Sequence, residues 1–497
     1  MSRIEEFLRK EQISKVKGKD GRIYEIKECI GEGGQGAVFK TQHPNLLVKL
    51  SVKKSDSIKE IEATYHRYAN LRSRQDAPKN MAKPLAELII IQVKKNDKEA
   101  LLYGYVMELM EDMIPLSETF RKKNEDPIAF IKRFGGIKRM YTILRKLAET
   151  LDEVHSAGFC YGDLNPNNVF ISKDLDYTEV QLIDCDNMVF AADFDGRIYY
   201  PGYGAPELIK NQTNNMMTDT WSFAVLAFYL LRQELPFNGK MIQDAKTEKI
   251  SIMEAKQNAS ELPWIDDPSG ENENSSALPK EAMFRNPIYN LFDRTFGNDH
   301  NCYSRPILQE WIKELRKAEG AFFICGNSEC QMTYLVQKSR TCPFCESKVP
   351  REYLIIVASQ KFSAIDTDTK NIVKISIVKN KESKTVLNDR DVFTHIFWTG
   401  NKNIVASVTL SNQKAAIKFS EDIDISVYVN NEKKGIGQFK KDNERKLSLE
   451  KGKTYSLELP SFKPNYDFFY TDTESINTDS NTLKYNCTNV INFKLAE

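Results

Sequence analysis

Hydrophobic and polar positions follow two different rhythms along this chain. From residue 24 to residue 109, short apolar runs alternate with polar turns in the manner of β-strands, at 24–30, 37–42, 45–51, 85–93 and 101–109. Among them, 57–73 instead repeats its apolar side chains every three or four positions and predicts a helix. Helical spacing then dominates in 130–158, 218–233 and 305–319. A β-rich part followed by a helical part predicts two lobes with a cleft between them.

The remaining segments complete the expected order of domains. Residues 1–20 are charged and predict a short helix with a lead-in, and the Pro-, Ser-, Asn- and acid-rich stretch 261–279 predicts a surface loop. Short alternating runs separated by Asn, Asp, Gly and Lys turns follow residue 351 and predict an all-β sandwich. We therefore expect an α+β chain with an N-terminal extension, a two-lobed domain, a small cysteine-bearing segment and a β-sandwich, at 1–20, 21–318 (lobes about 21–110 and 111–318), 319–350 and 351–497.

Composition and charge exclude several classes of protein. A chain of 497 residues exceeds one ordinary domain, and 41% hydrophobic residues suffice for buried cores. Lys and Arg total 70 against 69 Asp and Glu, whereas a dedicated nucleic-acid binder carries a basic excess. No apolar run approaches the ~20 residues of a membrane span, and the charged first ten residues do not resemble a secretory signal. Nine mostly dispersed cysteines are typical of a reducing compartment, so we expect a cytoplasmic protein.

A glycine-rich turn lies between two of the predicted strands. It reads G-x-G-x-x-G-x-V and brings together Gly31, Gly33, Gly34, Gly36 and Val38. Because glycine lets the backbone approach a phosphate closely, this turn is a candidate nucleotide site. A plain glycine turn explains the motif equally well when it is taken alone.

A lysine and a glutamate follow the glycine turn in the order that phosphate binding requires. Lys49, on the next strand, can pair with the α- and β-phosphates of a nucleotide. Either Glu60 or Glu62 of the following helix can hold this lysine in place. We favour Glu62, since Glu60 lies nearer the helix start, where acids are common because they complement the helix dipole.

The segment 161–170, YGDLNPNNVF, carries the strongest chemical signal. Asp163 and Asn168 precede a β-type run, and Asp184 ends the next one. Phosphoryl transfer needs a carboxylate to orient or deprotonate the attacking hydroxyl, and oxygen ligands for Mg²⁺. We therefore predict Asp163 as the base and Asn168 and Asp184 as magnesium ligands. Asp and Asn beside Pro are also common turn formers, but turns do not explain the joint order of all these motifs.

Together these motifs resemble those of bacterial eukaryotic-like Ser/Thr protein kinases. Residues 161–168 are similar to the family's H-R-D-L-K-P-E-N loop, and 205–207 read A-P-E. Asp219 matches the aspartate that opens the family's large central helix, and Arg305 matches the arginine that pairs with the A-P-E glutamate, here Glu207.

The resemblance implies a fold, cofactors and partners. It implies a two-lobed kinase fold in which Met107 precedes an adenine-contacting hinge that includes Glu108 and Met110. It also implies ATP with Mg²⁺ (or Mn²⁺) and transfer of the γ-phosphate to Ser or Thr of protein substrates. The family further suggests a metal-dependent protein phosphatase and a von Willebrand A-type protein as partners, with no membrane association and no dedicated nucleic-acid binding.

Several positions depart from the family pattern. Gly162 replaces the arginine that meets a phosphorylated activation loop, and 185–204 holds no Ser or Thr, so we expect activity without Ser/Thr phosphorylation there. Asn165 replaces the lysine that neutralises the γ-phosphate, and Cys185 and Asp186 replace Phe-Gly of the D-F-G motif. These losses favour one alternative, a nucleotide-binding pseudokinase scaffold. The similarity of the G-D-L-N-P-N-N loop to aminoglycoside and choline kinases keeps another open, a small-molecule kinase.

Four of the nine cysteines form two pairs with short internal spacing, Cys325 with Cys330 and Cys342 with Cys345. Each pair can supply two thiolates to a tetrahedral Zn²⁺, and ~30 residues are too few for an independent apolar core. We therefore expect a structural zinc ribbon in which metal supplies folding energy; four ordinary cysteines or a redox site are the alternatives.

The region 351–497 resembles a forkhead-associated β-sandwich in its closing strands. Residues 424–459 hold an asparagine turn and a Leu-x-x-Gly motif like that family's. The residues with which the family reads phosphothreonine are not recognisable, so we expect a sandwich used for docking or assembly.

Overall fold

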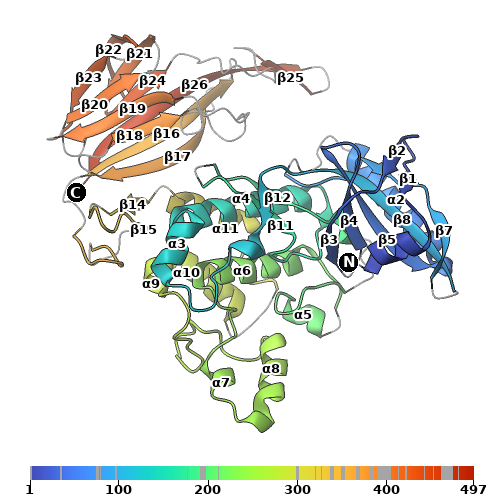
Figure 1. Cartoon of the computed structure of the whole chain (residues 1–497). Helices are drawn as coiled ribbons and strands as arrows, with labels where there is room; N and C mark the ends of the chain where they lie inside the picture. Colours follow the sequence, from blue (N-terminus) through green and yellow to red (C-terminus); the bar gives the residue numbers. More distant parts are fainter. Residues whose placement is uncertain are drawn as a thin grey trace. The chain divides into compact units, whose positions relative to one another are not determined.

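The computed structural model divides the chain into two compact units, coloured along the sequence in Figure 1. One unit comprises Met1–Gly135, Thr142–Lys280 and Asn286–Ile312, and the other comprises Gly136–Tyr141, Glu281–Arg285 and Lys313–Glu497. The described residues are 3–33, 36–73, 78, 80–95, 98–175, 177–190, 197–210, 212–297, 302–319, 321–325, 327–335, 341–348, 353–364, 370–380, 384–388, 404–411, 414–419, 422–441, 443–450, 453–459, 474–478 and 481–496.

The amino-terminal lobe is an antiparallel sheet with strand order β3-β4-β5-β8-β6, and β7 pairs with β8. Buried side chains on alternate positions of these strands, such as Ala37 and Phe39, form its core with Phe7 and Leu8 of a short first helix. The elements are α1 (Arg3–Lys10), β1 (Lys15–Lys17), β2 (Ile23–Glu25), β3 (Cys29–Gly33), β4 (Gly36–Lys40), β5 (Leu46–Lys54), β6 (Ala86–Glu87), β7 (Ile91–Lys95) and β8 (Lys98–Glu108).

The run 85–93, expected as one strand, is divided between β6 and β7. Between them Leu88 forms a bridge with Gly18, and the Ile89 N–H donates to the Lys17 carbonyl. At Leu88 the backbone still donates to the Gly104 carbonyl of β8 while it also pairs with the segment after β1, a long-range contact that local spacing does not encode.

The predicted helix at 57–73 is α2 (Ile58–Ser73), preceded by the 3₁₀ turn η1 (Ser55–Ser57). Its buried face includes Ile61, Tyr65 and Tyr68, which cluster with Tyr105 of β8. The Tyr65 hydroxyl donates to the Gly104 carbonyl at 3.0 Å and accepts from the Gly104 N–H at 3.1 Å. The helix is thus fixed to β8 by packing and by hydrogen bonds.

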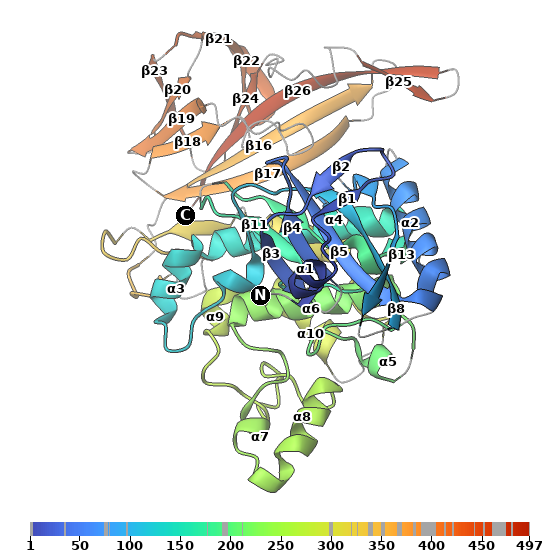
Figure 2. The ribbon, with the colours of Figure 1, turned by 45° about the vertical axis from the view of Figure 1, so that its right-hand side comes forward.

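The carboxyl-terminal lobe is helical and is built around α6, which lies among the other helices in Figures 1 and 2. Residues 218–228 of this helix are all buried, as expected of a helix that is apolar on every side. The helices are α3 (Pro127–Phe134), α4 (Ile137–Ser156), α5 (Pro206–Ile209), α6 (Met216–Arg232), α7 (Lys240–Gln243), α8 (Ile250–Asn258), α9 (Lys280–Met283), α10 (Asn286–Phe296) and α11 (Leu308–Glu319), with 3₁₀ turns η2 (Leu116–Thr119) and η4 (Thr247–Lys249).

Two features of the helical part differ from the predicted pattern, the break between α3 and α4 and the presence of α8. The segment 130–158 is broken because Gly135 and Gly136 both have positive φ, 94° and 90°, which ends α3 before α4 begins. The helix α8 was not predicted because it has no buried residue and so carries no apolar periodicity. The loop expected at 261–279 contains neither helix nor strand.

Short strands of the helical lobe carry the loops of the candidate site. A three-stranded sheet has the order β12-β11-β9, and β10 pairs with β13. Within the described residues, a parallel bridge joins Met81, from the segment after α2, to Leu182. The elements are β9 (Met113–Pro115), β10 (Phe159–Cys160), β11 (Val169–Ser172), β12 (Val180–Leu182), the 3₁₀ turn η3 (Cys185–Asn187) and β13 (Val189–Phe190).

The second unit holds the cysteine-bearing hairpin of β14 (Phe322–Ile324) and β15 (Thr333–Leu335), and then a β-rich region that confirms the predicted fold class. One sheet has the order β17-β16-β26-β24-β21-β22, with β25 on β26, and the other has the order β18-β19-β20-β23. Figure 2 shows β16 and β26 side by side along their length. The strands are β16 (Tyr353–Ala364), β17 (Lys370–Asn380), β18 (Lys384–Asn388), β19 (Ile404–Ser411), β20 (Lys414–Phe419), β21 (Ile423–Val429), β22 (Glu432–Phe439), β23 (Glu444–Ser448), β24 (Thr454–Leu459), β25 (Glu474–Thr478) and β26 (Asn481–Ala496).

A search for membrane-spanning segments covered the described part of the chain. None of the helices there is both long enough and apolar enough to cross a bilayer.

Candidate active site and metal centre

Asp163 lies between β10 and β11, surrounded by three carboxamides. The Asn165 Nδ2 lies 3.0 Å from the Asp163 carbonyl oxygen and 3.2 Å from Oδ1. The Asn168 Nδ2 lies 2.9 Å from the same carbonyl and 3.2 Å from Oδ2, and the Asn187 Nδ2 lies 3.4 Å from Oδ2. Burial raises the pKa of Asp163, and the three amide donors and the charge of Lys49 oppose that rise.

The Asp219 carboxylate accepts hydrogen bonds from the backbone of this loop. One carboxylate oxygen accepts from the Tyr161 N–H at 2.7 Å, and the other accepts from the Gly162 N–H at 2.8 Å. The His155 Nε2 lies 3.0 Å from the first oxygen. Asp219 is 2% exposed, so these bonds fix the loop in a water-poor setting.

Lys49 and Asp184 meet across the two lobes. The Lys49 Nζ lies 2.6 Å from the Asp184 Oδ1, and the lysine is 7% exposed. Asp184 has φ 63°, the left-handed region that L-residues with larger side chains rarely adopt. The lysine and the aspartate that the sequence assigned to phosphate and metal are therefore adjacent to each other, and the charge of Lys49 acts on Asp163.

The carboxylate and the carboxamide beside the base suit a hard divalent cation. Asn168 uses its amide nitrogen on Asp163, so its carbonyl oxygen is the group that would bind a cation, together with the Asp184 carboxylate. Mg²⁺ and Mn²⁺ prefer such oxygen donors.

The predicted pair between Lys49 and Glu62 is not formed in this structure. Glu62 is exposed and makes no ion pair among the described residues, while Glu60 pairs with Lys53 at 3.0 Å. The reason is the rotation of α2, whose buried face is set by Ile61 and Tyr65, so that the neighbouring Glu62 points to solvent.

The glycine-rich turn joins β3 to β4 beside Lys49. Gly33 pairs with Gly36, and Val38 lies opposite Lys49 on β5. A Cβ on Gly36 would come within 2.5 Å of the Leu50 carbonyl oxygen, so only glycine fits there. Gly34 lies outside the described residues, and Gly31, like Gly33, belongs to β3.

The predicted hinge follows the register of β8. Met107 lies opposite Leu47, and Glu108 opposite Leu46, at the end of β8. The next N–H, of Leu109, donates to the Asn45 carbonyl at 2.8 Å, and Met110 follows outside any helix or strand.

The segment around Asp184 is tied to both lobes. The Cys185 Sγ donates to the Ala82 carbonyl at 3.0 Å, and the Ala82 N–H donates to the Leu182 carbonyl at 2.8 Å. The Tyr161 hydroxyl donates to the Ile183 carbonyl, and burial raises the pKa of Tyr161. Cys185, which replaces a phenylalanine in the related motif, therefore has a polar partner of its own.

A buried ion pair supports the A-P-E segment. The Arg305 guanidinium donates to both carboxylate oxygens of Glu207, at 2.9 and 3.1 Å, and lies 4.9 Å over the Trp221 ring. Asn214 adds a link between the activation segment and the catalytic loop, because its amide binds the Ile198 carbonyl at 2.7 Å and the Gly162 carbonyl at 3.4 Å.

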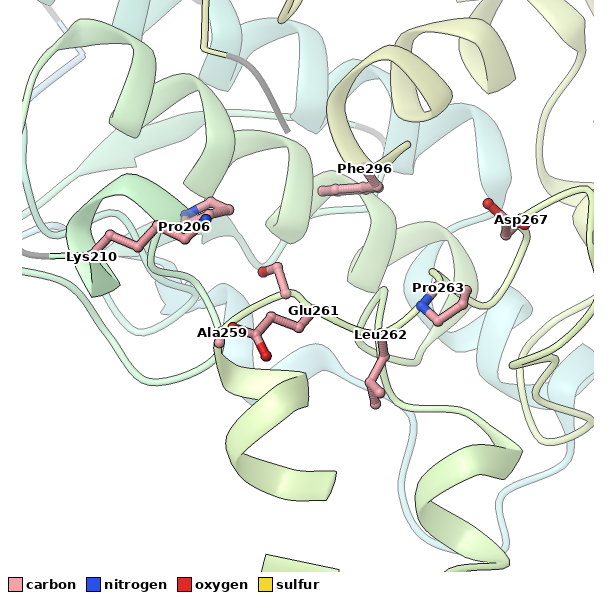
Figure 3. A pocket seen from close by; sticks show the side chains of 9 residues that line it. Pro206, Lys210, Ala259, Glu261, Leu262, Pro263, Asp267 and Phe296 are labelled. Atoms are coloured by element: carbon pink, nitrogen blue, oxygen red, sulfur yellow. The ribbon is translucent and has the colours of Figure 1, made fainter. Parts of the chain in front are cut away.

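A cavity of about 280 Å³ lies beside the A-P-E segment. Figure 3 shows Pro206 and Lys210 on one wall and Leu262 and Pro263 on the other, with Phe296 between them. The lining of the cavity is mixed: apolar side chains such as Leu262 and Phe296 stand beside Glu261, and the exposed Lys210 also lines it. It lies on the helical lobe, where the A-P-E platform is built.

The four clustered cysteines converge in the second unit. All four Sγ atoms lie within 4.8 Å of one another, with 3.5 Å between Cys325 and Cys345 and 3.8 Å between Cys330 and Cys342. A tetrahedral Zn²⁺ with ~2.3 Å bonds has sulfur atoms about 3.8 Å apart, so the donors fit this metal. Burial raises the pKa of the Cys325 and Cys342 thiols, and a bound cation would offset this cost by stabilising the thiolates.

Sequence reasoning missed three carboxamide functions in the site. It did not single out Asn187 or Asn214, and it placed Asn165 in the position of a phosphate-facing lysine. The structure instead brings Asn165 and Asn187 onto Asp163. The only local signal was the density of Asn residues around Asp163 and Asp184, which is equally typical of turns.

Comparisons with known proteins agree with this geometry. The family model described as protein kinase domain matches residues 24–306, more than half of the chain. Ribosomal protein S6 kinase alpha-2 of Homo sapiens is 28% identical over 245 residues, which are 48% of this chain and 30% of that protein. Ribosomal protein S6 kinase 2 alpha of Xenopus laevis is 35% identical over 117 residues, 23% of this chain and 15% of that protein. The chain therefore spans less than a third of the length of these relatives.

Proposed function

The chain belongs to the protein kinase family, and from this premise we propose that it transfers the γ-phosphate of Mg-ATP to Ser or Thr of protein substrates. The observation that carries the proposal is the convergence of Lys49, Asp163 and Asp184, with Asn168 beside them. Phosphoryl transfer requires a base, a cation that binds phosphate and oxygen atoms that bind a metal ion. Asp163, Lys49 and the pair Asn168 and Asp184 would supply them.

In the proposed reaction each side chain has one task. Asp163 accepts a hydrogen bond from the substrate hydroxyl and takes its proton as the oxygen attacks the γ-phosphorus and ADP leaves. Lys49, which now neutralises Asp184, pairs instead with the α- and β-phosphates. Asn168 and Asp184 would hold Mg²⁺, which neutralises charge on the transferred phosphate when it is bound.

The helical lobe supports a protein substrate rather than a small molecule. The buried Glu207–Arg305 pair and the loop anchor Asp219 build a rigid platform below the A-P-E segment. The cavity in Figure 3 offers space for a substrate side chain beside Pro206.

Transfer of label from γ-labelled ATP to protein tests the proposal, with Asp163→Ala as the control. We expect label on Ser or Thr with the wild type and a loss of at least a hundredfold with the variant, since general base catalysis contributes about 10²- to 10⁴-fold. Equal labelling by both proteins would reject the assignment of Asp163.

A pseudokinase scaffold is the second candidate, favoured by Asn165 and by the exposed position of Glu62. Nucleotide binding measured in parallel separates the two functions. Saturable ATP binding without any transfer to protein would identify a scaffold, and binding with transfer would identify an enzyme.

We infer finer features from the family resemblance and from the donor set. The cysteine cluster is proposed as a structural zinc ribbon because the four thiols lie at tetrahedral spacing.

Action in bacterial signalling, with a metal-dependent phosphatase and a von Willebrand A-type protein as partners, is proposed from the catalytic-loop resemblance. Co-purification of these partners with the tagged protein would support that proposal.

A further inference from the structure

The carboxamides of Asn165 and Asn187 are buried beside Asp163 and take no part in the proposed proton transfer or metal binding. Asn165 is 2% exposed and Asn187 is 8% exposed. Burying a carboxamide is costly unless it is hydrogen-bonded, so the partners of these groups indicate their function.

Asn165 has both ends of its side chain engaged within the catalytic loop. Its Nδ2 donates to the Asp163 carbonyl and approaches the carboxylate Oδ1 at 3.2 Å. Its Oδ1 accepts from the Asn167 N–H at 3.0 Å. A side chain held at both ends and shielded from solvent is aimed at the base and not at a bound phosphate.

Asn187 reaches Asp163 from the other side, on the segment that carries Asp184. It is the last residue of the 3₁₀ turn η3 (Cys185–Asn187), which follows Asp184 directly. Its Nδ2 lies 3.4 Å from the Asp163 Oδ2, the oxygen that Asn168 also approaches. One turn thus connects the metal-binding carboxylate to the base.

We propose that Asn165 and Asn187 are positioning residues that fix the two carboxylate oxygens of Asp163 from opposite sides. Asn165 holds Oδ1 from within the catalytic loop, and Asn187 holds Oδ2 from the magnesium-binding segment. In related kinases a lysine at this position contacts the γ-phosphate. In this chain Asn165 instead aligns the carboxylate of Asp163. The inference rests on the proposed kinase function.

Asn187→Asp tests the role of Asn187, because it keeps the shape but replaces the amide donor by a second carboxylate. We expect kcat to fall about ten- to a hundredfold, the value of one hydrogen bond to a charged group. The KM for ATP and the Mg²⁺ concentration for half-maximal rate should change by less than about twofold. Asn187→Ala should lower kcat in the same way but less, since it adds no repelling charge.

The opposite kinetic pattern would overturn the role of Asn187. If it were a metal ligand, Asn187→Asp would retain kcat and lower the Mg²⁺ requirement, whereas Asn187→Ala would raise it. If it were only structural, both variants would lower the unfolding temperature while kcat per folded molecule stayed unchanged.

Asn165→Lys tests the role of Asn165, because it restores the residue that related kinases carry. Positioning predicts that kcat falls at least about tenfold, since the lysine removes the bond to Oδ1 and cannot be buried without cost. A phosphate-contact role predicts that kcat rises, which would overturn the inference.

Asn167→Ala is the matched control from the same loop. The Asn167 side chain is exposed and makes no hydrogen bond among the described residues, so kcat should stay within about twofold of the wild type. A wild type without any transfer activity would overturn the proposed function and this inference together. An active wild type with unaffected Asn165 and Asn187 variants would overturn only the inference.

Discussion

Side chains of the site satisfy one another's charges and hydrogen-bonding groups. Lys49 neutralises Asp184, and three carboxamides surround Asp163. A buried charge without a partner is costly, so these contacts stabilise the site.

Substitutions of Lys49 and of Glu62 are expected to have very different effects on kcat/KM for ATP. Lys49→Met should lower kcat/KM for ATP at least about a hundredfold, because it removes the buried cation of the site. Glu62→Gln should change it less than about threefold, because the glutamate is exposed and Tyr65 fixes the helix that carries it. Steady-state kinetics of both variants measure this; equally severe losses would mean that α2 rotates to form the pair when ATP binds.

The Glu207–Arg305 pair is expected to matter for stability. Arg305→Ala leaves Glu207 buried without a counter-charge and should lower the free energy of unfolding by about 3–5 kcal/mol. Arg294→Ala breaks a half-exposed pair with Glu310 and should cost less than about 1 kcal/mol. Denaturant unfolding compares the two, and similar losses would show that the buried pair has no special weight.

Among the elements, the segment after α2 connects the lobes through backbone bonds. The Ala82 N–H and the Leu182 N–H donate across the bridge between this segment and β12, at 2.8 and 3.0 Å. The strand that leads to Asp184 is thereby attached to residues 80–82 of the amino-terminal lobe.

The cysteine hairpin is the element expected to depend on metal. Purified protein should contain about one Zn²⁺ per chain, and Cys342→Ser should lose it, together with protection of residues 322–348 from proteases. Cys302→Ser, which lies outside the cluster, is the control and should retain the metal. Less than about half an equivalent of zinc in a folded wild type would contradict the proposed ribbon.

For the molecule as a whole, the order of the motifs along the chain predicted the fold and the candidate site better than any single motif did. The lobes, the long helices and the residues Lys49, Asp163, Asn168 and Asp184 follow from local spacing and from chemistry that needs them together. The rotation of α2 and the partners of Asn187 depend on packing between distant segments, which a periodic pattern does not contain. The spacing of apolar residues did not predict the helix α8, because none of its residues is buried.

Activity of the chain should not require Ser/Thr phosphorylation in the segment 185–204. Gly162 has no side chain to meet a phosphate, and its backbone is held by Asp219 and Asn214 instead. Phosphatase-treated protein should therefore keep its rate within about twofold. Loss of activity together with a mapped phosphosite in 185–204 would contradict this expectation.

The most direct test of the account is a single-turnover measurement of γ-phosphate transfer to a protein substrate, made with the wild type and with Asp163→Asn. The variant keeps the size of the side chain but cannot take the proton. The wild type should form phosphoserine or phosphothreonine, and the variant should do so at least about a hundredfold more slowly, with ATP still bound. Equal rates, or no transfer by a wild type that binds Mg-ATP, would contradict the proposed function.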